Sequence, residues 1–210
     1  MSSATLSKFT VPLDGSQPQG MLHPKLKYRF RVTFENFGAK GTATTELTKQ
    51  VVSFARPTVQ FEAIELPTYN SRIYVAGRHA WQTVATTLRD DATGQVSKLI
   101  GQQVQKQFDF FEMSSAAAGI DYKFTTRIEI LDGGNGAAAA GILETWECYG
   151  CFLQNTDYGD LNYGTNEVAT VALSIRYDNI LHEAGTVGVG TLVGRQAATQ
   201  AITGLTPGAA

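Results

Sequence analysis

Cysteine is scarce in this chain of 210 residues, which contains only Cys148 and Cys151. Two cysteines do not make the disulfide framework of a small secreted domain. They are spaced as C-x-x-C within a predicted strand, where an offset of three puts side chains on opposite faces and their Cα atoms roughly 10 Å apart. A disulfide needs less than about 7 Å, and no second cysteine pair exists to complete a zinc site. We therefore expect both cysteines to be inert packing residues.

Histidine and the common catalytic motifs are equally rare. The three histidines, His23, His79 and His182, form no i, i+4 pair and no local cluster. There is no G-x-S-x-G elbow, and no G-K-[ST] follows the Gly-rich stretch at residues 132–136. Scattered carboxylates such as Asp160 are normal in solvated loops. We expect no catalytic residue, no metal site and no cofactor, so the protein is predicted not to be an enzyme.

Long hydrophobic runs are also missing. No stretch approaches the roughly 18 apolar residues of a membrane-spanning helix. The N-terminal sequence MSSATLSKFTVPLDG has no charged start followed by an apolar run, so no signal peptide is expected. These absences predict a soluble protein, made in a cytoplasm, with no membrane partner.

Charge is low and unevenly distributed. Charged residues make up 17% of the sequence, below the roughly 25% that is usual. Residues 1–128 hold 15 Lys+Arg and 10 Asp+Glu, which gives a net charge of +5. Residues 129–210 hold 2 Lys+Arg and 9 Asp+Glu, which gives a net charge of -7, so the whole chain carries -2. Either the two halves interleave in one fold and the asymmetry cancels, or one copy attracts another. The net charge argues against a nucleic-acid binder.

Period-two patterns dominate what is present. In residues 27–36, Tyr28, Phe30, Val32 and Phe34 alternate with polar residues, which predicts a strand. Residues 36–48 are rich in Gly and Thr and predict a loop. Similar patterns predict further strands over residues 50–57, 79–91, 121–131, 142–155 and 166–180.

One stretch has a helical period instead. In residues 93–112, Val96, Ile100, Val104 and Phe108 recur every three or four residues, which predicts one amphipathic helix. Acidic residues just before it suit the unpaired N–H groups of a helix start. The fold class predicted is α+β and mainly β, an antiparallel sandwich or barrel with one flanking helix.

The chain divides into three parts on composition. Residues 1–24 contain three prolines and predict an arm, residues 25–183 form the β domain, and residues 184–210 form a tail rich in Gly and Ala. Within the domain, residues 56–79 are strongly apolar, yet two prolines and Gly77 predict an irregular extended segment. Such a segment needs cover, either from its own domain or from another chain.

The strand at residues 142–155 is apolar on both faces. Strict alternation places Trp146, Cys148 and Phe152 on one side, and Tyr149, Cys151 and Leu153 on the other. A strand buried on both faces needs two covering layers. With a single helix predicted, a second subunit is one source of the missing layer.

The order of these segments resembles that of the tail tube proteins of contractile-tailed bacteriophages. The resemblance runs from about Lys27 to Asn179. It rests on LRDD before the helix, on the Trp-containing strand that leads to YGDLNYG, and on the closing RYDN. The first 24 and last 27 residues lie outside it.

The resemblance implies a β-barrel-like domain that forms hexameric rings, which stack into a hollow tube. It implies a sheath protein outside the tube, a tape measure protein and then DNA in its lumen, and baseplate and tail terminator proteins at its ends. The expected location is the virion tail, assembled in the host cytoplasm. Three alternatives stay open: the tube of a type VI secretion or other contractile injection system, a monomeric β-sandwich binding module such as a sugar-binding domain, and a monomeric enzyme.

On this interpretation the tube conducts DNA without binding it tightly. Arg29, Arg31, Lys123 and Arg127 are expected to face outward or to pair across subunits rather than to line the lumen. Eight residues are expected at contacts between subunits or rings, namely Arg56, Phe61, Ile64, Tyr69, Tyr74, Trp146, Tyr149 and Leu153.

Overall fold

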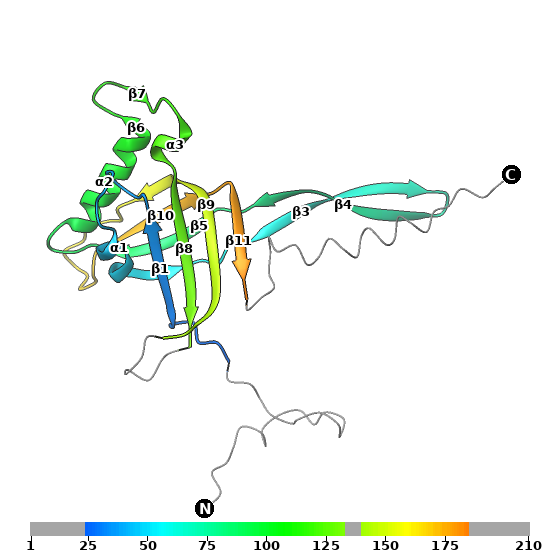
Figure 1. The fold of residues 1–210 in the computed structure, drawn as a ribbon, viewed down its shortest axis with the longest axis horizontal. Helices are drawn as coiled ribbons and strands as arrows, with labels where there is room; N and C mark the ends of the chain where they lie inside the picture. Colours follow the sequence, from blue (N-terminus) through cyan, green and yellow to red (C-terminus); the bar gives the residue numbers. More distant parts are fainter. Residues whose placement is uncertain (1–23, 133–139, 185–210) are drawn as a thin grey trace, which may run out of the picture.

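The computed structural model describes residues 24–132 and 140–184, and Figure 1 shows a β-rich body from which one long hairpin projects. The predicted arm at residues 1–24 and tail at residues 184–210 lie almost wholly outside the described residues. Within the described part, no helix has both the length and the apolar character needed to cross a membrane.

Seven strands form the main sheet, in the order β1-β8-β9-β10-β5-β2, with β11 also paired to β9. All the pairings are antiparallel, as predicted. The strands are β1 (Phe30–Glu35), β2 (Val51–Phe54), β5 (Val84–Arg89), β8 (Phe124–Leu131), β9 (Ile142–Asp157), β10 (Thr170–Arg176) and β11 (Asn179–Glu183).

The long strand β9 belongs to two layers. Its first part pairs with β8 and β11, and its last part, Phe152–Asp157, pairs with β10. The first layer therefore contains β1, β8, β11 and the start of β9, and the second layer contains β2, β5, β10 and the end of β9. A single core cluster draws side chains from both layers, so the predicted antiparallel sandwich is confirmed.

Alternation along the strands fills this core. Val84, Thr86 and Leu88 of β5 point inward, as do Val171, Leu173 and Ile175 of β10, and the residues between them face out. Helix α2 (Gln95–Gln107) adds Val96, Leu99 and Ile100, which are all buried. The sequence predicts one helix flanking the sheets, and the apolar residues that follow its 3.6-residue period pack against the core cluster.

The helix is shorter than the predicted 93–112. Gly94 precedes it with a left-handed φ of 68°, and Asp91 accepts hydrogen bonds from the N–H groups of Val96 (2.9 Å) and Gln95 (3.3 Å). Hydrogen bonds from Thr93 and from these N–H groups hold the pKa of Asp91 below its usual range. At the other end, Phe108 is already extended and begins a small strand pair.

The sequence analysis does not predict four short elements, two helices and two strands. Helix α1 (Thr45–Gln50) lies in the segment predicted as a loop, and its single buried side chain, Leu47, leaves no periodic pattern. Beyond α2, β6 (Phe108–Asp109) pairs with β7 (Ser114–Ser115), and α3 (Gly119–Tyr122) follows.

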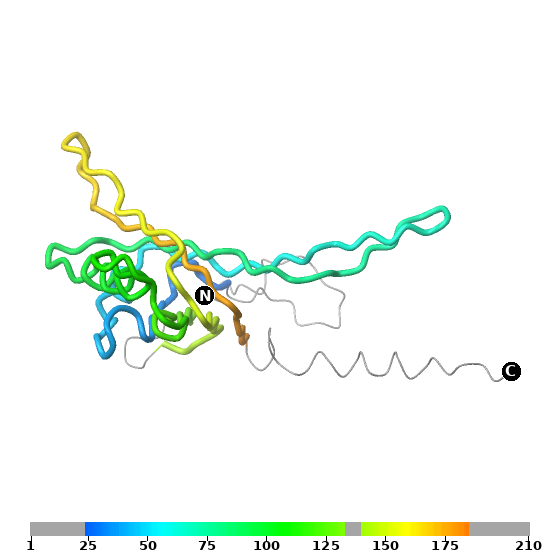
Figure 2. The backbone as a smooth tube through the Cα atoms, turned by 90° about the horizontal axis from the view of Figure 1, so that it is seen from above, coloured from blue at the N-terminus to red at the C-terminus, as the bar shows by residue number. Residues whose placement is uncertain are grey.

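The segment predicted to be irregular is instead a regular hairpin. Strand β3 (Val59–Thr68) pairs with β4 (Ser71–Trp81), so the strand predicted over 79–91 is divided between β4 and β5. Pro67 is tolerated because both strands of an isolated hairpin are edge strands. Gly77 lies at a register shift, where an added Cβ would sit 3.0 Å from the carbonyl oxygen of Glu62. Figure 2 shows how far this hairpin extends from the body.

The prediction that Cys148 and Cys151 lie on opposite faces is wrong. Phe124 pairs with Cys151 and Thr126 with Cys148, so three residues of β9 span the space of two on β8. Gly150 absorbs the extra residue with a φ of 66°. This bulge reverses the alternation, so both cysteines and Leu153 point into the core, and Phe152 points away from it.

Candidate assembly surfaces

The β3–β4 hairpin has one apolar face. Ile64 lies opposite Val75, and Leu66 lies opposite Ile73, so the four side chains form two adjacent cross-strand pairs. Their exposed fractions are 48%, 46%, 48% and 53% in that order. The face is therefore a contiguous apolar patch that is exposed on the described part of the subunit.

The opposite hairpin face is less apolar, because it carries the charged residues Glu65 and Arg72 beside Ala63, Ala76 and Tyr74. Glu65 lies opposite Tyr74, and its carboxylate pairs with Arg72 at 3.1 Å. Tyr69 occupies the turn at the tip and is 99% exposed. The hairpin is therefore amphipathic, although a two-stranded hairpin alone is only marginally stable in water.

An aromatic series anchors the hairpin to the body. The centres of the Phe61 and His79 rings are 6.3 Å apart. The His79 ring is 6.0 Å from the Trp81 ring, and the Trp81 ring is 5.9 Å from the Tyr177 ring. Phe61 is exposed, whereas Trp81 and Tyr177 belong to the core. Burial raises the pKa of Tyr177 to about 12. This series fixes the base of the hairpin while leaving its outer part uncovered.

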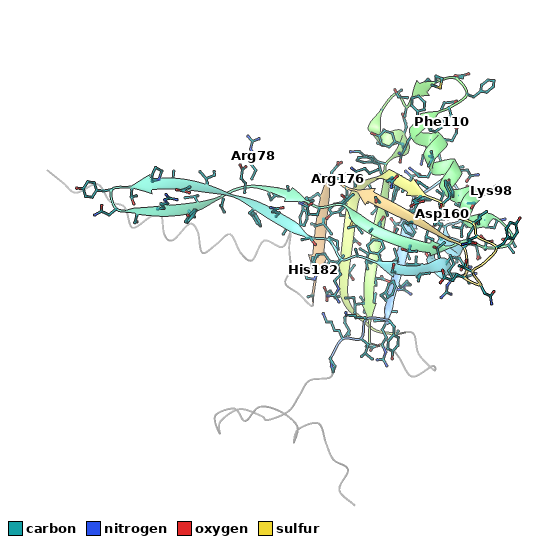
Figure 3. The ribbon with its side chains drawn as sticks, turned by 180° about the vertical axis from the view of Figure 1, so that it is seen from behind. Arg78, Lys98, Phe110, Asp160, Arg176 and His182 are labelled. Atoms are coloured by element: carbon teal, nitrogen blue, oxygen red, sulfur yellow. The ribbon has the colours of Figure 1, made fainter. Side chains whose placement is uncertain are left out.

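A second exposed group lies beyond α2. Phe110, Phe111 and Met113 are all exposed where the chain turns between β6 and β7, and Figure 3 labels Phe110 on this projection. The carboxylate of Asp109 accepts hydrogen bonds from the N–H groups of Phe111 (2.8 Å) and Glu112 (3.2 Å), which fix the turn. These bonds also hold the pKa of Asp109 below its usual range.

A third exposed group is the loop between β9 and β10, which we call the acidic loop (residues 157–168). Tyr158, Leu161, Tyr163 and Val168 are exposed there. The side chains of Asp157 and Asn162 accept hydrogen bonds from the N–H groups of Gly159 (2.9 Å) and Gly164 (2.8 Å), which are typical of Asx turns.

A cavity of about 670 Å³ opens where the two ends of the sheet order, β1 and β2, fail to pair. We call it the seam groove. Its apolar lining includes Phe30, Val52, Phe54, Ile130 and Trp146, and basic side chains border it at Lys25, Lys27, Arg29 and Arg56.

A buried carboxylate, Glu144, lies beside this groove. It pairs with Lys25, and it accepts hydrogen bonds from Trp146 Nε1 at 2.6 Å and His182 Nε2 at 2.9 Å. The rings of Trp146 and His182 stack at 3.8 Å. Burial by itself raises the pKa of Glu144, but the hydrogen bonds from Lys25, Trp146 and His182 outweigh it and hold that pKa below its usual range.

The cations of the first layer pair within the subunit. Arg31 donates to Glu129 at 2.6 Å, Arg127 pairs with Glu147, and Lys123 pairs with Asp178. Arg29 donates to the carbonyl oxygen of Asp132 at 2.6 Å. Each of these four side chains therefore has a partner within its own subunit, and the expectation that they face outward or pair across subunits stays a prediction.

Seven of the eight predicted contact residues fall into three groups at the surface. Phe61, Ile64, Tyr69 and Tyr74 lie on the hairpin, Arg56 and Trp146 line the seam groove, and Tyr149 is exposed on β9 with its hydroxyl donating to Glu147. Leu153 is buried in the subunit's own core, so its side chain is absent from the surface. Sequence reasoning missed Phe111 and Leu161, which stand out only as large apolar residues in turn-rich segments.

The cysteines are placed for packing. Burial raises the pKa of both thiols, that of Cys151 to about 11, and Cys151 Sγ donates to the carbonyl oxygen of Cys148 at 3.2 Å. Thiolates are the reactive form, so both groups are poor nucleophiles at neutral pH. Among the described residues, no three His, Cys, Asp or Glu side chains gather as metal ligands.

No family model matches the sequence, and no curated protein matches it either. Solved structures do share its fold. A chain of the anti-feeding prophage baseplate, in a six-fold symmetrised structure, is 14% identical, with a TM-score of 0.58 over 80% of this chain and 100% of that chain. A chain of the cap that terminates the same prophage's tube is 12% identical, with a TM-score of 0.58 over 81% of this chain and 98% of that chain.

A third similar structure comes from a sheath-tube complex in the extended state. This chain of an extracellular contractile injection system is 16% identical, with a TM-score of 0.51 over 78% of this chain and 93% of that chain. The fold is therefore one that chains of a baseplate, a tube-terminating cap and a sheath-tube complex share, as the resemblance predicted. More particularly, it is a mainly β, antiparallel fold of the tail-tube-like kind.

Proposed function

We propose that this chain is the repeating subunit of the inner tube of a contractile phage tail, in which hexameric rings stack into a hollow cylinder. The observation that carries the proposal is the amphipathic hairpin, whose apolar face has no cover from the described part of its own subunit. Joined to a tail tube fold, such a projection is explained by a neighbouring subunit or ring that covers it.

The outer face of the second layer suits the wall of the channel. Ala172 lies beside Thr87, and Ser174 beside Ala85, so the middle of this face carries small uncharged side chains. The cations Arg89 and Arg176 lie at opposite ends of the paired strands. A wall of this kind offers few cations that could bind the phosphates of DNA, which suits a channel through which DNA must pass and exit.

The proposal also includes the other proteins of such a tail. A sheath protein surrounds the tube, a tape measure protein occupies the lumen before DNA does, and baseplate and terminator proteins cap the ends. The chain thereby belongs to the virion tail and assembles in the host cytoplasm.

Assembly is the first test. Light scattering and negative-stain microscopy over a concentration series are expected to detect sixfold rings or tubes. A compact monomer of 22.7 kDa at every concentration would refute the proposal and favour a monomeric binding module.

Passage of DNA is tested on the assembled tubes. Each phosphate contact adds a slope of about -0.9 to the dependence of log affinity on log salt. We expect negligible binding of duplex DNA at physiological salt in an anisotropy titration. Micromolar binding with a steep salt slope would show that the lumen is basic.

The choice between a phage tail and another injection system is tested by labelling. An antibody to this chain is expected to label the tails of purified phage particles. Labelling of a cell-bound secretion apparatus instead would assign the tube to type VI secretion or a related system.

A further inference from the structure

The seam groove is a site with unmatched positive charge. Lys25 already pairs with Glu144, and Arg29 already donates to the carbonyl oxygen of Asp132. Lys27 and Arg56 form no ion pair within residues 24–132 and 140–184. The groove therefore offers a ligand an apolar floor and two cations at its border.

The acidic loop has the complementary properties. Leu161 is 91% exposed and Tyr163 is fully exposed, although both are large apolar side chains. Asp160 and Glu167 lack ion-pair partners in the described part of the chain. Turn hydrogen bonds from Gly159 and Gly164 give the loop a defined shape before it meets a partner, which reduces the entropy lost on binding.

The two surfaces lie on different sides of the subunit. Trp146 of the groove stacks on His182 of β11, the strand nearest the hairpin in Figure 1. The acidic loop projects from the other side of the body, where Figure 3 labels Asp160. Since β9 and β10 hold both ends of the loop, it reaches a seam groove only on another copy.

We propose that the acidic loop of one copy seats in the seam groove of a second copy, with Leu161 or Tyr163 on the apolar floor and Asp160 and Glu167 facing Lys27 and Arg56. This contact is heterologous, because two different surfaces of the same chain meet, and such contacts propagate into rings or filaments. The inference rests on the proposed function, since it names the surfaces through which the tube subunits join.

Charge reversal tests the electrostatic part. The groove variant K27E/R56E and the loop variant D160K/E167K are each expected to raise the concentration needed for assembly about tenfold. Combining all four substitutions in one chain is expected to restore assembly. The matched control K40E/K98E changes two exposed lysines elsewhere, on the α1–β1 side and on α2, and is expected to leave the threshold unchanged.

Cross-linking tests the seating itself. Val52 of the groove is 43% exposed, and Leu161 marks the loop. When V52C and L161C proteins are mixed and oxidised, a disulfide-linked pair containing one copy of each is expected. The buried native thiols do not compete.

The outcomes separate this inference from the proposed function. Tubes that form normally in both charge variants, or mixed V52C and L161C tubes without the disulfide, would overturn the loop-in-groove contact and leave the tube intact. A groove filled by a segment of its own chain would give the same negative result. Wild-type protein that forms no rings would overturn the proposed function instead.

Discussion

Replacing Leu66 and Ile73 with serine removes half of the apolar face of the hairpin. The two residues oppose each other in the strand register and are 48% and 53% exposed. Full burial of such a side chain contributes about 1.5–3 kcal/mol, and roughly half of that surface is still open here. The pair therefore offers about 1.5–3 kcal/mol to a subunit contact, which corresponds to about a 10- to 150-fold change in affinity.

The assay measures assembly and folding separately. The threshold concentration for assembly of L66S/I73S, followed by light scattering, is expected to rise by that factor. The melting temperature of the unassembled subunit is expected to stay the same, since neither side chain reaches the core. The control A63S/A76S changes an opposed pair on the other face of the same hairpin.

Two results would refute the reasoning. An unchanged threshold in L66S/I73S would mean that the apolar face remains in water after assembly. An equal loss of assembly and of subunit melting temperature would mean that the hairpin is part of the subunit's own folding unit.

Three further predictions concern the body of the subunit. The variant C148S/C151S is expected to lose about 1–3 kcal/mol on chemical denaturation and still assemble, whereas bound zinc or loss of assembly at full stability would show that the thiols act chemically. Because the pKa of Glu144 is lowered on folding, its contribution to stability is present above about pH 4.5 and lost as pH falls through the folded pKa. E144Q is therefore expected to flatten the acid side of the melting-temperature profile, and an unaltered profile would contradict this. G150A is expected to lose about 1 kcal/mol or more in urea unfolding, because its φ of 66° disfavours a Cβ; equal stability would show that the bulge relaxes freely.

Local patterns predicted the elements whose side chains meet their own core. The alternation in residues 27–36 predicted β1, and the helical period predicted α2, because one face of each packs on the same cluster. The hairpin lacked that guide. All its residues are exposed apart from a half-buried Gly77 and a buried Trp81, so no inward set imposed a pattern. Its proline and glycine are placed where a hairpin tolerates them, near the turn and at a bulge.

The candidate surfaces were only partly predictable. Large apolar residues in the hairpin segment pointed to Phe61, Ile64, Tyr69 and Tyr74, which lie exposed as a contact requires. In the acidic loop, the sequence analysis interprets Asp160 only as a carboxylate of a solvated loop, and the hydrogen bonds of the loop are typical of Asx turns. What the sequence did not reveal is that the same turns hold Leu161 outward, since exposure depends on where β9 and β10 end.

The wrong side assigned to Cys151 and the two-layer fold have one physical cause. Strict alternation along β9 requires a flat strand in a single sheet, and under that rule Cys148 and Cys151 must lie on opposite faces. Gly150 breaks the rule by taking a left-handed φ and adding one residue to the strand. The strand bends there, leaves β8 and β11, and joins β10. A glycine inside a C-x-x-C of an otherwise apolar strand is thus better interpreted as a corner between two layers. The corner buries both thiols on the same side of the strand, and it also creates the sandwich from which the hairpin and the acidic loop project.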